Sequence, residues 1–138
     1  MPANSNPISP LTPAESWNPT PLVSANTALD GTGTVGTIII AGVNGSKVPR
    51  VRVVHRGTNI LTVIRIFENN GLTNATPANN NLVAEAAVPA NALSQTAASL
   101  FFDILLNLIL KPGYKLLYTI GTGVAAGHSV GVPDAGDY

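Results

Sequence analysis

The stretch 31–36 is the part of the sequence that most nearly matches a cofactor-binding motif. It reads GTGTVG, which fits the GxGxxG pattern of dinucleotide-binding proteins. That pattern binds a pyrophosphate only where it follows a strand and opens a helix, because the helix N-terminus holds the anion. Here it leads into Ile38-Ile39-Ile40, and β-branched residues favour a strand. We therefore interpret the glycines as turn formers and expect no cofactor.

The residue types that most often catalyse reactions or bind metals are few and scattered. The chain has no cysteine, and His55 and His128 are its only histidines. Asp134 and Asp137 near the C-terminus have the chemistry to ligate a hard cation, but two carboxylates in a polar tail are usually solvated. No serine or threonine lies in a nucleophile-elbow sequence, and no acidic pair lies in a motif for acid–base catalysis. We expect neither a metal site nor an enzyme.

Basic residues are concentrated in one part of the chain. Five of the seven fall between the second and fourth predicted strands, namely Lys47, Arg50, Arg52, Arg56 and Arg65. We expect them to form a basic patch, with Arg50, Arg52 and Arg56 as candidate protein-interface residues. Two interpretations stay open: a solvated sheet face that pairs across strands with Glu68 and Glu85, or docking onto an acidic protein surface. Nucleic acid is a weaker alternative, because seven acidic residues balance the seven basic ones.

The stretch 99–119 is the densest apolar run and must form the centre of the fold. Spacing of its polar residues by four fits a helix as well as a strand, but a helix would carry apolar residues around most of its circumference. The strand interpretation instead gives one fully apolar face, which includes Leu106, and one mixed face, which includes Asp103. Pro112-Gly113 then predicts a turn, and the alternation resumes over 114–120. We therefore predict a β-hairpin at the centre of the fold.

Further short strands separated by glycine, proline and asparagine turns surround this centre. They are expected over 35–41, 48–55, 59–68, 82–88 and 124–132, with a possible edge strand over 22–28 and with Pro49 near the start of its strand. A turn-rich loop over 69–81 is long enough to suggest a role of its own. The pattern predicts an all-β fold: a single antiparallel β-sandwich or jelly roll of about seven to nine short strands.

The segment 1–22 differs in composition from the rest. Its six prolines disfavour both a helix interior and a central strand, so we predict an extended N-terminal arm, followed by the β-sandwich domain over 23–138. Three interpretations are open: a disordered tail, an arm that docks on a partner through Trp17, the only tryptophan, or an arm whose Trp17 packs back on its own sheet.

Length and charge limit the classes of function. The 138 residues suit one domain, and only 10% of them are charged. The beginning of the chain lacks the features of a secretory signal, and the longest apolar stretch is too short to span a bilayer as a helix. We expect no membrane partner. Apolar surface that does not fit into one core usually contacts another subunit, so we expect a homo-oligomer, with a trimer favoured.

The region from Val51 onward resembles small β-sandwich virion proteins of tailed bacteriophages. The resemblance lies in VRVVHRGTNILTVIRIFENNG, LVAEAAVPA, LFFDILLNLILKPGYKLLYTIG and GHSVGVPDAGDY, with the LKPGYKL turn and the short terminal strand as the closest parts. Such proteins serve as capsid cement (decoration) proteins or as tail-associated components, and they are often trimeric. The resemblance implies a place on the capsid surface of a virion, with the major capsid protein or other virion subunits as partners.

Two hypotheses of function follow. In the first, a cement protein bridges capsid subunits through its arm, with Trp17, and through its basic strand face. In the second, a tail- or fibre-associated module binds a receptor or a carbohydrate through the loop 69–81. Carbohydrate sites usually present aromatic rings for stacking, and this loop has none, which favours the first hypothesis.

Overall fold

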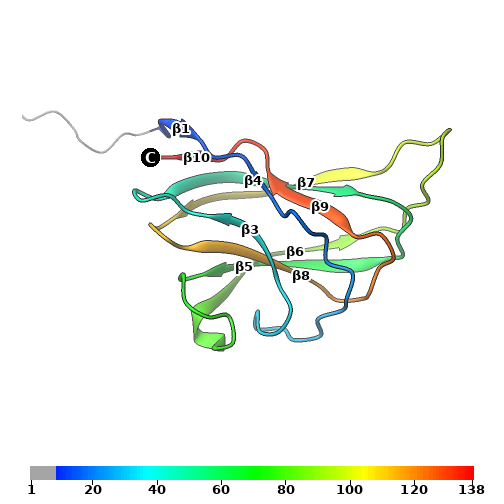
Figure 1. Ribbon diagram of the computed structural model, residues 1–138, viewed down its shortest axis with the longest axis horizontal. Coiled ribbons are helices and arrows are strands. Elements are labelled where there is room, and N and C mark those ends of the chain that lie inside the picture. Colours follow the sequence, from blue (N-terminus) through cyan, green and yellow to red (C-terminus); the bar gives the residue numbers. More distant parts are fainter. Residues whose placement is uncertain (1–8) are drawn as a thin grey trace, which may run out of the picture.

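The protein is an all-β sandwich, as the sequence predicts. The computed structural model describes residues 9–138, and in this range the chain forms ten strands in two antiparallel sheets and one short 3-10 turn, η1 (Pro77–Asn79). The two sheets pack face to face as an upper and a lower layer (Figure 1). Three of the ten strands are only two residues long, which is why their number exceeds the expected seven to nine.

Sheet A, the upper layer in Figure 1, is built around one long strand. β4 lies between β7 on one side and β9 and β10 on the other, and β2 and β1 extend the sheet beyond them. Its strands are β1 (Thr12–Pro13), β2 (Ser16–Trp17), β4 (Ser46–His55), β7 (Phe101–Leu110), β9 (His128–Val132) and β10 (Gly136–Asp137).

Sheet B, the lower layer, has four strands in the order β3-β8-β5-β6. β8 and β5 are central and almost wholly buried, whereas β6 forms one edge and is half exposed. The strands are β3 (Gly36–Ile40), β5 (Thr62–Asn69), β6 (Asn80–Val88) and β8 (Lys115–Ile120).

The apolar stretch at the centre of the sequence forms strands, but the predicted hairpin is wrong. β7 alternates as expected, and Gly113 adopts the positive φ of +74° that the turn requires. However, β7 pairs with β4 in sheet A, while β8 pairs with β3 and β5 in sheet B. The turn therefore carries the chain from one sheet to the other, since β8 is apolar on both faces and is buried between two neighbours, whereas β7 has one mixed face and lies at an edge.

Two further local predictions are also wrong. The stretch 22–28 forms no strand. Pro49 lies inside β4 and not near its start, at the point where the register against β7 shifts. A proline cannot donate a hydrogen bond to a neighbouring strand, so such an irregularity is where it is tolerated within a sheet.

The prolines do not keep the N-terminal segment out of the sheet. Thr12–Pro13 pairs with β10, and Ser16–Trp17 pairs with β9. Beyond β2, the Asn18 amide and the Leu22 backbone N–H donate to the hydroxyl of Tyr118, at 2.9 and 3.2 Å. Both strands are only two residues long: Ser16–Trp17 fits between Pro13 and Pro19, and Pro13 itself ends the other strand. Residues 1–8 of the predicted arm lie outside the described residues.

The core lies between the two sheets and consists mostly of β-branched and leucine side chains. Phe102, Ile104, Leu106 and Leu108 of β7 pack against it, as the strand interpretation predicts. Tyr118 is almost fully buried, and burial raises the pKa of its hydroxyl. The fully buried side chains include Val48, Val51, Val53, Ile64, Ile66, Leu110, Leu116, Ile120, Val130 and Val132.

Candidate docking surface

The outer face of sheet A carries most of the residues that the sequence singles out. Val51 and Val53 of β4 are fully buried, so Arg50 and Arg52, which alternate with them along the strand, point away from the core. We define the outer face of sheet A as the side of β4 and β7 that points away from the core, together with Trp17 and Asp134. The register places its side chains in cross-strand pairs: Val54 with Phe101, Arg52 with Asp103, Arg50 with Leu105 and Lys47 with Ile109.

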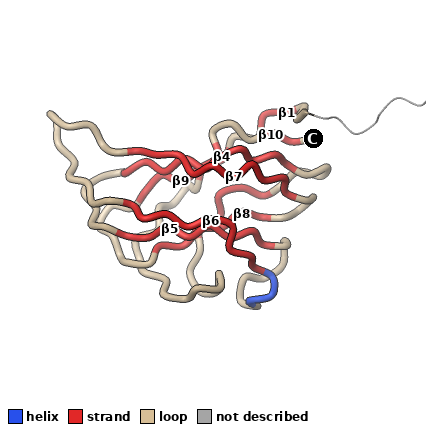
Figure 2. The backbone as a smooth tube through the Cα atoms, turned by 180° about the vertical axis from the view of Figure 1, so that it is seen from behind, coloured by secondary structure: helices blue, strands red, loops and turns tan. Residues whose placement is uncertain are grey.

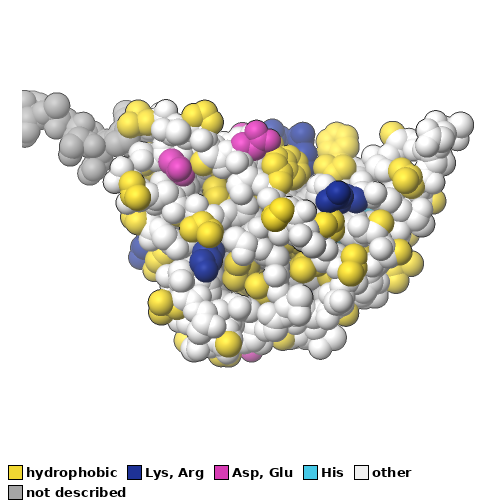
Figure 3. Space-filling view, viewed as in Figure 1, with side chains coloured by type: hydrophobic (Ala, Val, Ile, Leu, Met, Phe, Trp, Pro, Cys, Tyr) yellow, Lys and Arg dark blue, Asp and Glu magenta, His cyan; other side chains and the backbone are white. Residues whose placement is uncertain are grey.

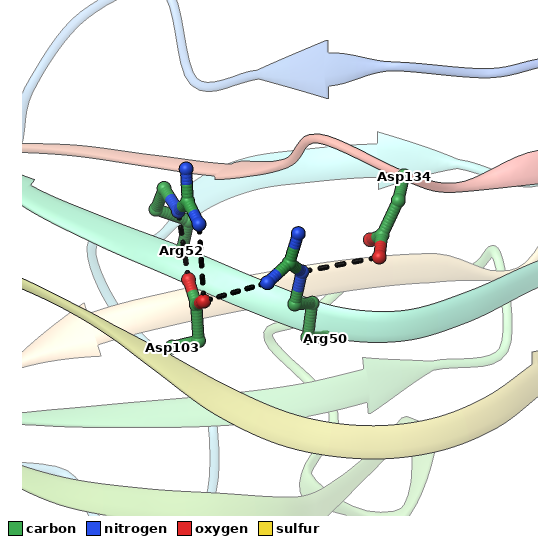
Figure 4. Close-up of polar contacts among 4 residues, drawn as sticks. All are labelled: Arg50, Arg52, Asp103 and Asp134. Carbon is green, nitrogen blue, oxygen red and sulfur yellow. Dashed lines mark hydrogen bonds and ion pairs between the residues drawn. The ribbon is translucent and has the colours of Figure 1, made fainter.

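A connected cluster of ion pairs occupies the middle of this face. The Asp103 carboxylate lies between two guanidinium groups, accepting from Arg52 Nε at 2.8 Å and from Arg50 Nη1 at 2.8 Å (Figure 4). Arg50 Nε also donates to Asp134 at 3.1 Å. Three strand or loop segments thus supply one network, in which two positive charges meet two negative ones. The Asp103 side chain is 23% exposed, so water screens this network only partly.

The network fixes the protonation state of its carboxylate. The hydrogen bond from Arg52 holds the pKa of Asp103 below its usual value of 3.8, and the charge of Arg50 acts in the same direction against the opposing effect of burial. Conversely, Asp103 raises the pKa of Arg52. The cluster is therefore fully charged but locally neutral over the physiological range of pH.

Apolar side chains surround the charged cluster. Phe101, Leu105 and Ile109 are 61%, 76% and 61% exposed, although all three belong to a regular strand. The Arg52 guanidinium lies 5.3 Å from the centroid of the Phe101 ring, within the range of a cation–π contact. Figure 3 shows charged side chains of both signs together with hydrophobic ones along the upper margin, where sheet A lies. An exposed row of large apolar residues of this kind typically marks an interaction site.

Trp17 contributes to the same face from the N-terminal segment. Its ring lies directly over Gly131 of β9, where a Cβ atom would come within 2.3 Å of the ring. Gly131 lies on the outer side of β9, because Val130 and Val132 on either side of it face the core and are fully buried. Trp17 Nε1 donates to the Glu15 carboxylate at 2.8 Å. Trp17 thus packs on its own sandwich, which is one of the three interpretations of the arm. Its ring covers β9, and β4 lies between β9 and the strand that carries Asp103.

The five basic residues do not form one patch. Arg65 lies on sheet B and pairs with Glu85 across β5 and β6 at 3.4 Å, which is one of the cross-strand pairs the sequence suggested. Arg56 is exposed beyond the end of β4, where its backbone N–H donates to Gly127, and it lies outside the ion-pair cluster. Of the predicted interface residues, the structure therefore brings together Trp17, Arg50 and Arg52 on one face.

Neither Asp103 nor Asp134 is among the interface residues that the sequence predicts. The alternation in the sequence predicts that Asp103 lies on the mixed face of its strand, as observed, but it also predicts β8 as the partner of that strand, whereas the partner is β4. The sequence could have indicated this role of Asp103 only if β7 had been paired with β4, the strand that carries Arg50 and Arg52. Asp137, considered with Asp134 as a cation ligand, accepts instead from the Ser46 hydroxyl.

The two histidines meet in the interior. His55 and His128 are opposite one another on β4 and β9, 4% and 1% exposed, with ring centroids 4.7 Å apart. Burial lowers both pKa values, that of His128 to about 4 with a further contribution from His55. Among residues 9–138 no group of three or more His, Cys, Asp or Glu side chains is arranged to hold a metal ion.

The glycine-rich stretch and the asparagine-rich loop form one hydrogen-bonded unit. Gly31 and Gly33 have positive φ, as expected for turn formers. The Asn74 amide donates to the carbonyl oxygens of Gly31 and Gly33 at 3.0 and 2.9 Å, and the Asn80 amide donates to Asp30 at 3.0 Å. These amide groups are satisfied within the protein, so they stabilise the loops at this end of the sandwich.

Comparison with protein-family models, with curated proteins and with solved structures found no match to this chain. No helix among the described residues is long and apolar enough to cross a membrane.

Proposed function

We propose that this protein is a virion structural protein, a capsid cement (decoration) protein that binds and stabilises capsid subunits through the outer face of sheet A. The observation that carries the proposal is the combination of three exposed large apolar side chains with a fixed, locally neutral cluster of ion pairs on one regular sheet face. The sequence resemblance to phage virion proteins supplies the identity of the partner, the major capsid protein.

The charges on this face affect what kind of surface it fits. Because Asp103 and Asp134 offset Arg50 and Arg52, the face does not present the surplus of positive charge that an acidic partner would require. The arginines retain donors at the rim of the cluster, and the apolar residues flank them. Protein interfaces commonly combine aromatic and arginine side chains in this way. The face is therefore suited to a partner surface that is largely apolar with a few hydrogen-bond acceptors.

The alternative, a receptor- or carbohydrate-binding module that uses the loop 69–81, has less support. A carbohydrate site needs free polar groups and an aromatic platform. The amide groups of Asn69, Asn70 and Asn79 donate within the loop region, to Asn80, Asn79 and Thr73 respectively. The loop thus uses its asparagines to hold its own conformation.

Binding to capsids assembled without this chain tests the proposal. We expect the purified protein to sediment with such capsids and the Phe101→Ser variant to bind at least about tenfold more weakly, since one buried aromatic anchor contributes about 2 kcal/mol. Val43→Ser is the matched control, because Val43 is 89% exposed in the turn between β3 and β4. Failure of the unaltered protein to bind, or equal weakening by both variants, would contradict the proposed function.

A further inference from the structure

β7 and β6 carry the longest free strand edges among residues 9–138, and β7 is the longer of the two. β7 is ten residues long and pairs with β4 along one side, and no strand within residues 9–138 pairs with its other side. It contains no lysine and no proline, the residues that usually prevent a strand edge from pairing with another chain. The β3 edge of sheet B, in contrast, is partly covered, because the Ser16 hydroxyl donates to the Ile38 carbonyl.

We infer that β7 pairs edge to edge with β7 of a second copy of this chain, antiparallel and about a two-fold axis at Leu105. Two-fold pairing requires a strand that is complementary to itself, since each residue meets the symmetry-related one. A register centred on Leu105 satisfies this condition on both faces. On the outer face it places Phe101 opposite Ile109 of the second copy and Asp103 opposite Asn107; on the inner face it places Phe102 opposite Leu108 and Ile104 opposite Leu106.

The neighbouring registers are worse for reasons that are visible in the sequence of β7. Centring the pair on Asp103 would bring two like charges together, and centring it on Ile104 or Leu106 would set the Asp103 carboxylate against an apolar side chain. If the two-fold axis passed midway between two residues, side chains that belong on different faces of the sheet would have to lie opposite one another. With the axis at Leu105, Asn107, which has a φ of +49° and lies where the register of β7 against β4 shifts, is opposite Asp103, next to the central pairs formed by Ile104, Leu105 and Leu106.

The exposed apolar side chains of β7 supply part of the area that a pair requires. Phe101, Leu105, Ile109 and the adjacent Leu100 together expose about 490 Å² of apolar surface, at about 200 Å² for a large side chain. β6, which contacts β7 across the gap between the sheets, borders the same side of the sandwich and adds area (Figure 2). An interface of ordinary size takes about 800 Å² from each partner, so β6 and the backbone edge of β7 must contribute the remainder.

Single cysteines test the register directly, because the chain has none of its own. In the inferred pair the two Leu105 Cβ atoms lie about 4.5–5.5 Å apart, close to the separation in a disulfide. We expect Leu105→Cys to form a covalent dimer under mild oxidation. Phe101→Cys is the matched control on the same strand, since its two copies would be eight residues, or about 27 Å, apart.

Light scattering on the unaltered protein completes the test and does not depend on any capsid. We expect the mass of a dimer at micromolar concentration, and we expect Leu105→Lys to raise the dissociation constant at least about tenfold by placing two positive charges on the axis. Leu105 is 76% exposed, so this change leaves the core intact. A monomer or trimer mass, or equal crosslinking of the Phe101→Cys and Leu105→Cys proteins, would overturn the inference.

Discussion

The buried histidine pair should make the protein sensitive to acid well before its carboxylates are protonated. The pKa of His128 falls from 6.5 to about 4 on folding because burial disfavours the imidazolium, and the neighbouring His55 adds to the effect. Neither ring nitrogen of His128 has a hydrogen-bond partner within residues 9–138. Folding therefore favours neutral His128, and the associated stability is complete above the unfolded pKa and is lost as pH falls from 6.5 towards 4.

The size of this effect follows from the difference between the two pKa values. A tenfold change in a protonation equilibrium corresponds to about 1.4 kcal/mol, so the fall from 6.5 to about 4 corresponds to about 3 kcal/mol of unfolding free energy. This is a large fraction of the about 5–15 kcal/mol by which a domain is usually stable. The pKa of His55 is also lowered by burial and acts in the same direction.

Urea unfolding between neutral pH and about pH 4 measures this loss in the unaltered and His128→Leu proteins. Leucine fills a similar volume without a titratable group, so the His128→Leu protein should lose about 3 kcal/mol less over this range. Ser129→Ala, next to it on the exposed side of β9, is the control and should keep the full dependence. Equal acid sensitivity of the His128→Leu and unaltered proteins would refute the assignment.

Three further substitutions test the packing of sheet A. Leu106→Asp should prevent cooperative folding, because it places a carboxylate against the core at a cost of several kcal/mol; a soluble protein with a cooperative thermal transition would show that the facing of β7 is wrong. Trp17→Ala should lower the unfolding free energy by about 2 kcal/mol through loss of the contact with Gly131, and an unchanged value would mean that the ring contributes no packing. Asp103→Ala should lower it by about 1 kcal/mol at low salt and by less at high salt, whereas no dependence on salt would argue against the ion-pair cluster.

Local signals in the sequence were enough to predict the seven longer strands, β3 to β9. Alternation over β7 identified the core face that holds Ile104, Leu106 and Leu108, and Pro112-Gly113 identified the turn after it, because both features depend on residues close together in the chain. The partner of each strand depends on contacts between distant segments, and proximity in sequence suggested the wrong one for β7. The hairpin prediction failed for this reason.

The same limitation affected the candidate site. Arg50 and Arg52 were selected from the sequence, but their partner Asp103 is more than fifty positions away and meets them only because β7 pairs with β4. The place of Trp17 depends likewise on a two-residue strand between prolines, which is too short to produce a periodic pattern. The pairing of His55 with His128 is set by the register of β4 and β9 and left no signal in either strand alone.

A reconstruction by electron microscopy of capsids carrying this protein would test the central proposal most directly. We expect density for the sandwich on the outside of the capsid, with Phe101, Arg52 and Leu105 directed towards a capsid subunit. Density in which this face points to solvent while another surface of the sandwich makes the contact, or capsids that carry no density for the protein, would contradict it.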